Sequence, residues 1–515
     1  MSRLSISAIG LIIATILSKI LGFGRELTLS YFYGTGMQSE AYITALNIPG
    51  VLFACIGVAI STSFIPLYSG IKENEGELKA NLFTSNLINI VMILVGFITV
   101  FGIIFSREIV HVFAIGFTGE KLELTINFAR ILFLGSIFLE ISNIVSSYLQ
   151  IKGNYIIPGI IAIPYNIIIM VSIILSAKFN NYIIVYGTVF AMLIQVVIQL
   201  PFMYKHGFRY KTYLKVRDNH IKEMMYLVAP VFVGVAVNQI NALVDKTLAS
   251  TLSSGSIAAL NYANKLNGFI LALFVMSIST IVYPLFSKYI SKNKTDEFGK
   301  LINTIINLML LVLIPTSIGA MVLSEPIVKL LFERGAFGSN STIITSGALF
   351  FYSIGIIGFG LREILVRAFY SLKDTKTPMI NGVISVILNI VLNISLIKFM
   401  GVNGLALATS LSSILAVCLL INSLNKRMNV IKIKKLIILL IKSLGASAFM
   451  GVVVKTIYSL TINYIGEGFI GLAISIGGSV FVGIIIYLII ICNINIDETK
   501  LVISKIRTII QSKRS

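Results

Sequence analysis

The chain has 515 residues, of which 57% are hydrophobic and 12% charged, and its 41 Lys and Arg outnumber its 21 Asp and Glu, for a formal net charge of +20. Soluble domains carry about 25% charged residues, so this chain has too few to cover soluble cores with a polar surface. The composition excludes a soluble globular protein and indicates an integral membrane protein.

The basic residues lie mostly in short loops between apolar runs, where they set topology and meet anionic lipid headgroups. We expect no nucleic-acid partner, because no nucleic-acid-binding signature is present. Cys55, Cys418 and Cys492 lie inside or at the end of apolar segments, so we expect no disulfide framework. The N-terminal apolar run has no small-residue cleavage site before Lys19, and we interpret it as a retained first span.

The apolar stretches long enough to cross about 30 Å of hydrocarbon number fourteen, the first over residues 6–33 and the last over 466–493. The loops after even-numbered spans hold twenty Lys and Arg, and those after odd-numbered spans hold six. This asymmetry predicts that the even loops and both termini are cytoplasmic. The chain is expected to cross its membrane many times.

The sequence also repeats itself. Ile60-Ser61-Thr62 followed by Pro66 recurs as Ile278-Ser279-Thr280 followed by Pro284, and the same offset aligns Ile109-Val110 with Ile327-Val328. One repeat covers six spans, an even number, so both copies cross the membrane in the same direction. We therefore predict an all-α polytopic membrane protein of about fourteen transmembrane helices, in two parallel six-helix repeats plus two C-terminal helices. The predicted divisions are an N-lobe over 1–222 (spans 1–6), a C-lobe over 223–430 (spans 7–12), and spans 13–14 with a basic cytoplasmic tail over 431–515.

Charged residues inside the spans are costly, at roughly 2.5–3.5 kcal/mol for a central Lys or Arg. Those near span ends, such as Glu40 and Arg130, can reach the interface, and others can pair inside the bundle. Lys19, Arg25 and Lys265 are harder to explain in that way. Lys19 and Arg25 are separated by two glycines, at which a bent helix would turn both side chains inward. The pattern favours an anionic ligand in a cavity between two lobes.

Several segments of the sequence resemble those of a known protein family. They are Ser18-Lys19-Ile20-Leu21-Gly22-Phe23-Gly24-Arg25-Glu26, Gly34-Thr35-Gly36, Asn47-Ile48-Pro49, Asn261-Tyr262-Ala263-Asn264-Lys265-Leu266 and Asp374-Thr375-Lys376-Thr377-Pro378. Together they resemble the MurJ (MviN) family of lipid II flippases in peptidoglycan synthesis. That family belongs to the superfamily of multidrug, oligosaccharidyl-lipid and polysaccharide exporters. The resemblance runs through spans 1–12, and spans 13 and 14 match the family's fourteen.

The resemblance implies a cationic central cavity that binds the pyrophosphate and headgroup of the substrate. The family's basic positions are matched by Lys19, Arg25 and Lys265, and the acid after the second by Glu26. A further family arginine, in the middle of span 2, is not matched, since that region contains Phe53. The resemblance also implies an apolar groove from spans 13 and 14 for a polyprenyl tail.

A sodium site is implied by the same resemblance, with Na⁺ as the coupling ion. Its residues here are Asp245, Asn389, Asn393 and Thr409, whose oxygen atoms suit a hard cation. Asn389 and Asn393 are four residues apart and share a helix face. Asparagine side chains that bridge neighbouring helices produce the same pattern, so both interpretations stand at this point.

The predicted function is a lipid II flippase that moves the lipid-linked precursor from the inner to the outer leaflet by alternating access, without covalent chemistry. We expect no enzyme, because the movement needs no covalent chemistry. The expected energy source is the membrane potential or an ion gradient, because there is no nucleotide-binding glycine loop. Expected partners are lipid II, membrane lipids and cell-wall synthesis proteins. One alternative is a polysaccharide-lipid flippase or drug exporter of the same superfamily, and another is a membrane scaffold without transport.

Overall fold

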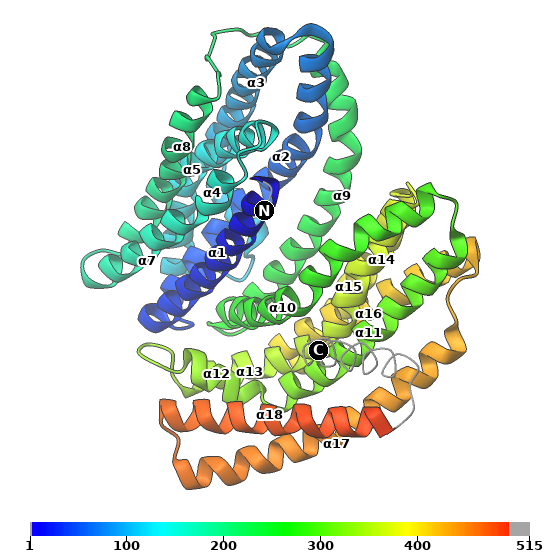
Figure 1. The fold of residues 1–515 in the computed structure, drawn as a ribbon. Helices are drawn as coiled ribbons and strands as arrows, with labels where there is room; N and C mark the ends of the chain where they lie inside the picture. Colours follow the sequence, from blue (N-terminus) through cyan, green and yellow to red (C-terminus); the bar gives the residue numbers. More distant parts are fainter. Residues whose placement is uncertain (1–2, 494–515) are drawn as a thin grey trace. The chain divides into compact units, whose positions relative to one another are not determined.

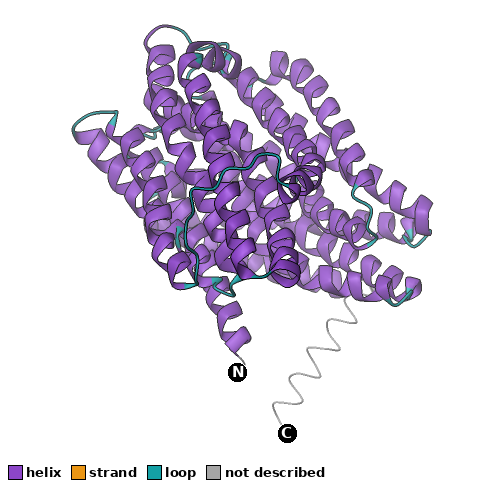
Figure 2. Cartoon of the chain, turned by 90° about the horizontal axis from the view of Figure 1, so that it is seen from above, coloured by secondary structure: helices purple, strands orange, loops and turns teal. Residues whose placement is uncertain are grey.

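The computed structural model describes residues 3–493, apart from the side chains of residues 3–13, 59, 230, 231, 233, 234, 238, 276, 277 and 280. Within that range every regular element is a helix (Figures 1 and 2). The predicted all-α fold is confirmed. The basic tail predicted at the C-terminus lies, from residue 494 onward, outside the described residues.

Ten helices of the described part are long and apolar enough to cross a membrane, and a bent pair, α13 with α14, counts as an eleventh span. Three other long helices, α1, α9 and α10, have 31, 32 and 36 residues and contain some of the side chains that are not described. These three would bring the number to the predicted fourteen, which stays a prediction. The chain is a multi-pass membrane protein.

The chain forms two compact units. The first comprises Met1–Ala258 and the short segment Arg334–Gly338, and the second comprises Ala259–Glu333 and Ser339–Ser515. The predicted lobes, defined by the sequence repeat, stay a prediction. The helices before residue 256 are α1 (Arg3–Tyr33), α2 (Met37–Glu75), α3 (Glu77–Ile104), α4 (Ser106–Phe113), α5 (Gly119–Ile151), α6 (Ile156–Ile160), α7 (Ala162–Lys178), α8 (Ile183–Lys205) and α9 (Asn219–Ser250).

The later helices are α10 (Ser256–Ser291), α11 (Thr295–Val322), α12 (Ser324–Phe332), α13 (Ser339–Ile354), α14 (Ile356–Ser371), α15 (Lys376–Met400), α16 (Val402–Met428), α17 (Ile433–Ile465) and α18 (Phe469–Asn493). Some of them begin at a fixed separation along the chain from an earlier helix. α3 and α11 begin at Glu77 and Thr295, and α4 and α12 begin at Ser106 and Ser324, with the same separation along the chain in both cases. The repeat seen in the sequence is thus also a repeat of helices.

In the first unit, α2 packs against α5 and α9, and α1 packs against α7. Buried aromatic rings fill the space between α2, α3 and α5. Tyr68 meets Tyr148 edge to face, with ring centroids 5.5 Å apart, and Phe64 stacks on Phe83 at 6.0 Å. Aromatic pairs at these separations add stability beyond the area they bury. The first pair joins α2 to α5, and the second joins α2 to α3.

In the second unit, α11 lies at the centre of the core. Its buried residues Ile302, Ile306 and Leu313 follow helical spacing and pack with residues of α14, α16 and α17. α17 and α18 lie side by side (orange to red in Figure 1). The Tyr487 hydroxyl of α18 lies 2.8 Å from Ser443 Oγ of α17 and donates to the Leu311 carbonyl of α11 at 2.8 Å. This bond ties the two extra helices to the core of the second unit.

The α13–α14 pair bends by 45° at Gly355. A Cβ atom at Gly355 would lie 2.7 Å from Ser410 Oγ and 2.9 Å from Ser410 Cα, both on α16. The glycine therefore lets α16 approach the bend closely.

Two loops on the predicted outer side make equivalent contacts inside the first unit. The Ala336 amide donates to the Tyr31 carbonyl at 2.8 Å, and the Gly116 amide donates to Ser250 Oγ at 3.0 Å. Tyr31 lies near the end of α1 and Ser250 at the end of α9, so each contact joins the end of a repeat's first helix to a loop of the other repeat. Gly335, with φ of +59°, has no room for a Cβ, which would lie 2.3 Å from the Tyr31 carbonyl oxygen.

Candidate functional site

Three of the predicted site residues, Lys19, Arg25 and Glu26, lie on α1 in the first unit. The exposed side chain of Lys19 lines a cavity of about 410 Å³ between α1, the end of α5 and α6. The Ser18 hydroxyl donates to the Gly159 carbonyl at 3.1 Å and fixes α1 against α6 beside this cavity. Lys19 therefore presents its positive charge at an opening large enough for a phosphate group.

Arg25 lies deeper in the unit, and its side chain is 17% exposed. Its Nη2 atom donates to Glu26 Oε1 at 2.8 Å, and its guanidinium carbon lies 6.0 Å from the centre of the Tyr165 ring. Glu26 partly compensates the charge of Arg25, and the aromatic ring adds a weak cation–π contact. A guanidinium has five N–H donors, so a phosphate can bind Arg25 beside Glu26.

The glycines between Lys19 and Arg25 do not open the helix. α1 stays helical through Gly22 and Gly24, and the expected bend stays a prediction. A Cβ at Gly22 would lie 3.9 Å from the Asn166 side chain, and one at Gly24 would lie 3.7 Å from Met170 Sδ. Both glycines thus face α7, at distances where a Cβ would make ordinary van der Waals contact.

Lys265 lies on α10 in the second unit, and its side chain is exposed. Its neighbours Tyr262 and Leu266 are buried, and the Tyr262 ring lies 5.2 Å from that of Phe332. Among the residues that the structure describes, no carboxylate lies within 4.0 Å of the Lys265 ammonium group. Buried neighbours therefore anchor the helix while the lysine keeps its charge accessible.

Three of the four predicted sodium-site residues come together in the second unit. Asn393 Nδ2 donates to Asn389 Oδ1 at 2.8 Å, and Asn389 Nδ2 donates to Thr409 Oγ1 at 3.3 Å, which joins α15 to α16. Asn389 and Asn393 are buried. Their amide and hydroxyl oxygens are neutral, hard donors of the kind that suit Na⁺. Asp245, the fourth residue, lies half-buried on α9 in the first unit.

The structure adds a charged pair that the sequence did not single out. Glu40 of α2, 1% exposed, forms an ion pair with Lys121 of α5 and also accepts a hydrogen bond from the Ile257 amide at 2.8 Å. The Lys121 ammonium lies 3.9 Å from the centre of the Phe117 ring. From its position, Glu40 was expected to reach the membrane interface. Its burial depends on the packing of three helix starts, which no local pattern reveals.

Glu140 of α5 is a second buried carboxylate, 3% exposed. Asn143 Nδ2 donates to it at 3.4 Å, and a Cβ at Gly57 of α2 would lie 3.1 Å from its Oε2 atom. No basic side chain among the described residues forms an ion pair with it. Gly57 thus makes room for the carboxylate, a relationship that only the α2–α5 packing reveals.

Comparison with known proteins shows to which family the chain belongs. The model of the family described as "Lipid II flippase MurJ" matches residues 29–495. The chain belongs to the MurJ family. A probable lipid II flippase MurJ of Buchnera aphidicola subsp. Baizongia pistaciae is 32% identical over 414 residues, which cover 79% of this chain and 80% of that protein. A probable lipid II flippase MurJ of Vibrio cholerae is 29% identical over 424 residues, covering 80% and 81%.

Solved structures agree with this membership. A lipid II flippase MurJ in an inward closed conformation matches with a TM-score of 0.79 and 28% identity, covering 93% of this chain and 97% of that one. A multidrug resistance transporter of the MATE family, in an inward-facing conformation, matches with a TM-score of 0.67 at 15% identity, covering 82% and 98%. The second likeness shows that this chain shares its fold with that transporter. Membership in a bacterial flippase family and the many apolar helices place the chain in the bacterial inner membrane.

Proposed function

We propose that this protein is a lipid II flippase that moves the lipid-linked peptidoglycan precursor from the inner to the outer leaflet of the cell membrane. The observation that carries the proposal is the match of the MurJ family model over residues 29–495. The headgroup of lipid II carries a pyrophosphate, two sugars and a peptide, and it is too polar to cross hydrocarbon alone. The protein therefore has to supply a polar path while the isoprenoid tail stays in the lipid.

Lys19, Arg25 and Lys265 would bind the pyrophosphate in a central cavity between an N-lobe (1–222) and a C-lobe (223–430). The fork of Arg25 suits two hydrogen bonds to one phosphate, whereas the lysines act as point charges. Glu26, bound to Arg25 at 2.8 Å, would orient the guanidinium and keep its charge partly compensated when no substrate is bound. The binding step needs no covalent chemistry, and no enzymatic reaction is proposed.

Transport would proceed by alternating access of the two lobes. Release on the outer side requires the outer loops to separate, including the contacts of Tyr31 with Ala336 and of Ser250 with Gly116. Each of these two hydrogen bonds contributes about 1 kcal/mol, and near the second one Thr247 Oγ1 of α9 also donates to the Val112 carbonyl at 3.1 Å. The proposal places both termini in the cytoplasm, as the basic-loop count predicts.

Sodium ions would couple to this movement through Asp245, Asn389, Asn393 and Thr409. The cluster of the last three residues supports this, because rotation of two amide groups would direct their oxygens to one ion. A carboxylate from Asp245 would supply the negative charge that neutral donors lack.

Partners of the protein would be lipid II, membrane lipids and cell-wall synthesis proteins.

The test is complementation of a bacterial strain depleted of its own lipid II flippase. We expect the unmodified chain to restore growth and variants lacking Arg25 to fail at equal expression. Failure of the unmodified, membrane-inserted chain, together with no binding of purified lipid II, would contradict the proposal. Transport of a polysaccharide lipid or a drug instead would favour the alternative exporters of the superfamily.

A further inference from the structure

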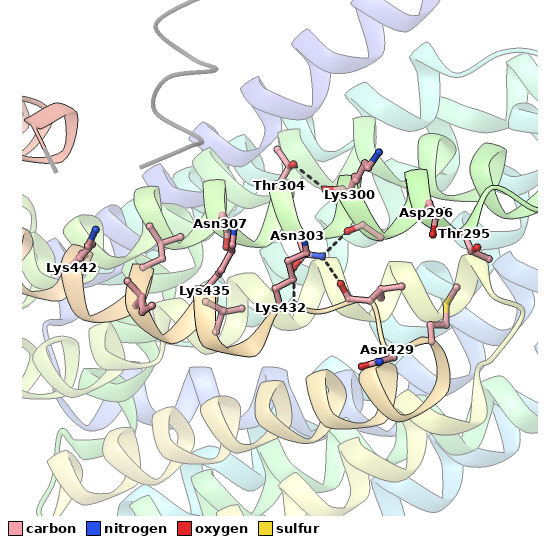
Figure 3. Close-up of a pocket in the computed structure, with 16 residues that line it drawn as sticks. Thr295, Asp296, Lys300, Asn303, Thr304, Asn307, Asn429, Lys432, Lys435 and Lys442 are labelled. Atoms are coloured by element: carbon pink, nitrogen blue, oxygen red, sulfur yellow. Dashed lines mark hydrogen bonds between the residues drawn. The ribbon is translucent and has the colours of Figure 1, made fainter. Parts of the chain in front are cut away.

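A second polar pocket lies in the second unit, away from the residues proposed to bind lipid II. It has a volume of about 650 Å³ and lies between α11, the end of α16 and the start of α17 (Figure 3). We call it the α11–α17 pocket. The residues that line it include four lysines, Lys300, Lys432, Lys435 and Lys442. Asp296 is the single acidic residue of the lining. Its lining therefore has a net positive charge.

The pocket has a defined polar floor. Asn303 Nδ2 of α11 donates to the Gly299 carbonyl at 2.6 Å and to the Val430 carbonyl at 2.7 Å, and its Oδ1 accepts from the Lys432 amide at 3.1 Å (Figure 3). These bonds fix the segment between α16 and α17 against α11. The backbone segments that carry Lys300 and Lys432 are thereby joined to each other.

The backbone adds to the positive charge. α11 and α17 both begin at this pocket, and neither has a side-chain hydrogen bond at its N-cap residue, Lys294 or Lys432. Helix N-termini carry partial positive charge and exposed N–H groups that favour anions. Lys435 and Lys442 are seven residues apart, two helical turns, and share one face of α17 with Leu439 between them.

An exposed apolar side chain of α17 also reaches the pocket. Ile438 lines the pocket and is 45% exposed. An exposed isoleucine on a membrane-spanning helix faces lipid chains. A ligand of this site therefore has an anionic group next to aliphatic chains, which describes a phospholipid better than a small soluble anion.

We propose that the α11–α17 pocket binds the headgroup of an anionic membrane phospholipid, with the phosphate among the lysines and an acyl chain beside Ile438 of α17. The loops that form the pocket follow spans 8 and 12, on the side where the basic-loop count places the cytoplasm. Basic pockets between transmembrane helices on that side suit anionic headgroups. Lys19, Arg25 and Lys265 do not line the pocket, so the site does not depend on the proposed binding of the lipid II pyrophosphate.

The experiment measures the thermal unfolding midpoint of the purified full-length chain in neutral detergent. Phosphatidylglycerol, phosphatidylcholine with the same acyl chains, and inorganic phosphate are titrated separately. We expect phosphatidylglycerol to raise the midpoint in a saturable way and the other two to have little effect. An equal rise with phosphatidylcholine, or with inorganic phosphate alone, would overturn the assignment of an anionic phospholipid.

Matched variants test the location. Lys435→Gln with Lys442→Gln removes two pocket lysines, and Lys426→Gln with Lys434→Gln removes two nearby lysines that do not line the pocket. Each basic residue near an anionic lipid contributes about a fivefold factor in affinity, so we expect about a 25-fold loss in the pocket variant and little change in the control.

Lys300 is an exposed residue on the facing helix, α11. Lys300→Gln is expected to lower the affinity for phosphatidylglycerol about fivefold, and it tests the site if the double variant unfolds. Equal losses in the pocket and control variants would overturn the site, as would full affinity in both Lys300→Gln and the pocket double variant. The readout is independent of flipping.

Discussion

Asn154 and Asp374 cap the helices that follow them in the same way, one repeat apart. Asn154 Oδ1 accepts a hydrogen bond from the Ile157 amide at 3.3 Å, and Asp374 Oδ1 accepts one from the Thr377 amide at 2.9 Å. Each capping residue precedes the amide it binds by three positions. Asp374 also accepts from Thr377 Oγ1 at 2.8 Å and pairs with Arg427 of α16. The second repeat thus adds a charge to a cap that is neutral in the first.

The Asp374 cap predicts a pH-dependent contribution to stability. Burial by itself raises the pKa of Asp374, but the hydrogen bonds from Thr377 and the charge of Arg427 outweigh it, and the pKa lies below its ordinary value of 3.8. A lowered pKa in the folded state stabilises the fold above the unfolded-state pKa, and this stability is lost as the pH falls through the folded-state pKa.

We expect Asp374→Ala to lower the free energy of unfolding by about 1 kcal/mol at neutral pH, with a smaller effect for Asp374→Asn, which keeps an acceptor. Thermal unfolding in detergent measures both. The difference between the unmodified chain and Asp374→Asn should shrink below pH of about 4. A difference that persists unchanged at low pH would contradict the charged cap.

The Glu40–Lys121 pair predicts a large effect of removing one partner. Loss of one member of a buried ion pair costs about 3–5 kcal/mol, because the other charge is left buried. Lys121 is 17% exposed, so we expect Glu40→Gln and Lys121→Gln each to cost about 3 kcal/mol, at the lower end of that range.

A double-mutant cycle by thermal unfolding checks the pair. The double variant should cost clearly less than the two single variants together, since neutral partners replace both charges. Additive costs would show that Glu40 and Lys121 act independently. Lys79→Gln, which removes an exposed lysine paired with Glu75, is the matched control and should change stability by less than about 1 kcal/mol.

If Lys19, Arg25 and Lys265 bind the pyrophosphate, substitutions at these three positions should differ in their effect. Arg25→Ala should abolish complementation and Arg25→Lys should not fully restore it, because lysine lacks the planar fork. Lys19→Arg and Lys265→Arg should be tolerated, because they keep the charge. Lys265→Ala should weaken lipid II binding about ten- to hundredfold, the loss of one charge-assisted contact of roughly 1.5–3 kcal/mol.

Complementation at matched expression, with lipid II binding in parallel, measures this series. Lys79→Ala controls for the loss of a positive charge elsewhere. The span 2 region has Phe53 and no arginine, so each remaining cation should matter more here than in relatives that have four. Normal growth of both Arg25→Ala and Lys265→Ala would rule out the anionic-headgroup mechanism.

Sodium binding predicts ion-specific stabilisation. At a sodium concentration 100 times Kd, binding should stabilise the folded protein by about 2.7 kcal/mol. Asp245→Asn should weaken this effect while lipid II binding stays measurable, and Asp296→Asn, an exposed acid outside the proposed set, should leave it unchanged. Thermal unfolding in NaCl against KCl makes the comparison. The absence of a sodium-specific shift in the unmodified chain would remove the hypothesis.

Topology is tested by cysteine labelling in a background without Cys55, Cys418 and Cys492. Arg217→Cys lies in the basic loop between α8 and α9, and Glu467→Cys lies between α17 and α18, where Glu467 is 74% exposed. We expect a membrane-impermeant reagent to label Glu467→Cys in intact cells and Arg217→Cys only after lysis. The reverse pattern would invert the predicted orientation.

The sequence by itself determined the membrane class, the helical fold, the repeat and the family. These depend on composition, on apolar length and on short motifs such as Ser18–Glu26, all of which are local or periodic along the chain. Lys19, Arg25 and Lys265 could be selected because a central charge in an apolar span is costly wherever the span packs.

Only the tertiary structure decided which charges meet. Glu40 binds Lys121, 81 residues away, and the Ile257 amide, 217 residues away, since three helix starts converge there. Arg25 binds the adjacent Glu26, whereas Asp374 binds Arg427 across 53 residues. At the α11–α17 pocket, Asn303 of α11 binds the Val430 carbonyl and the Lys432 amide, 127 and 129 residues away. Hydropathy and spacing describe one segment at a time, and side-chain partners depend on how the helices pack against one another.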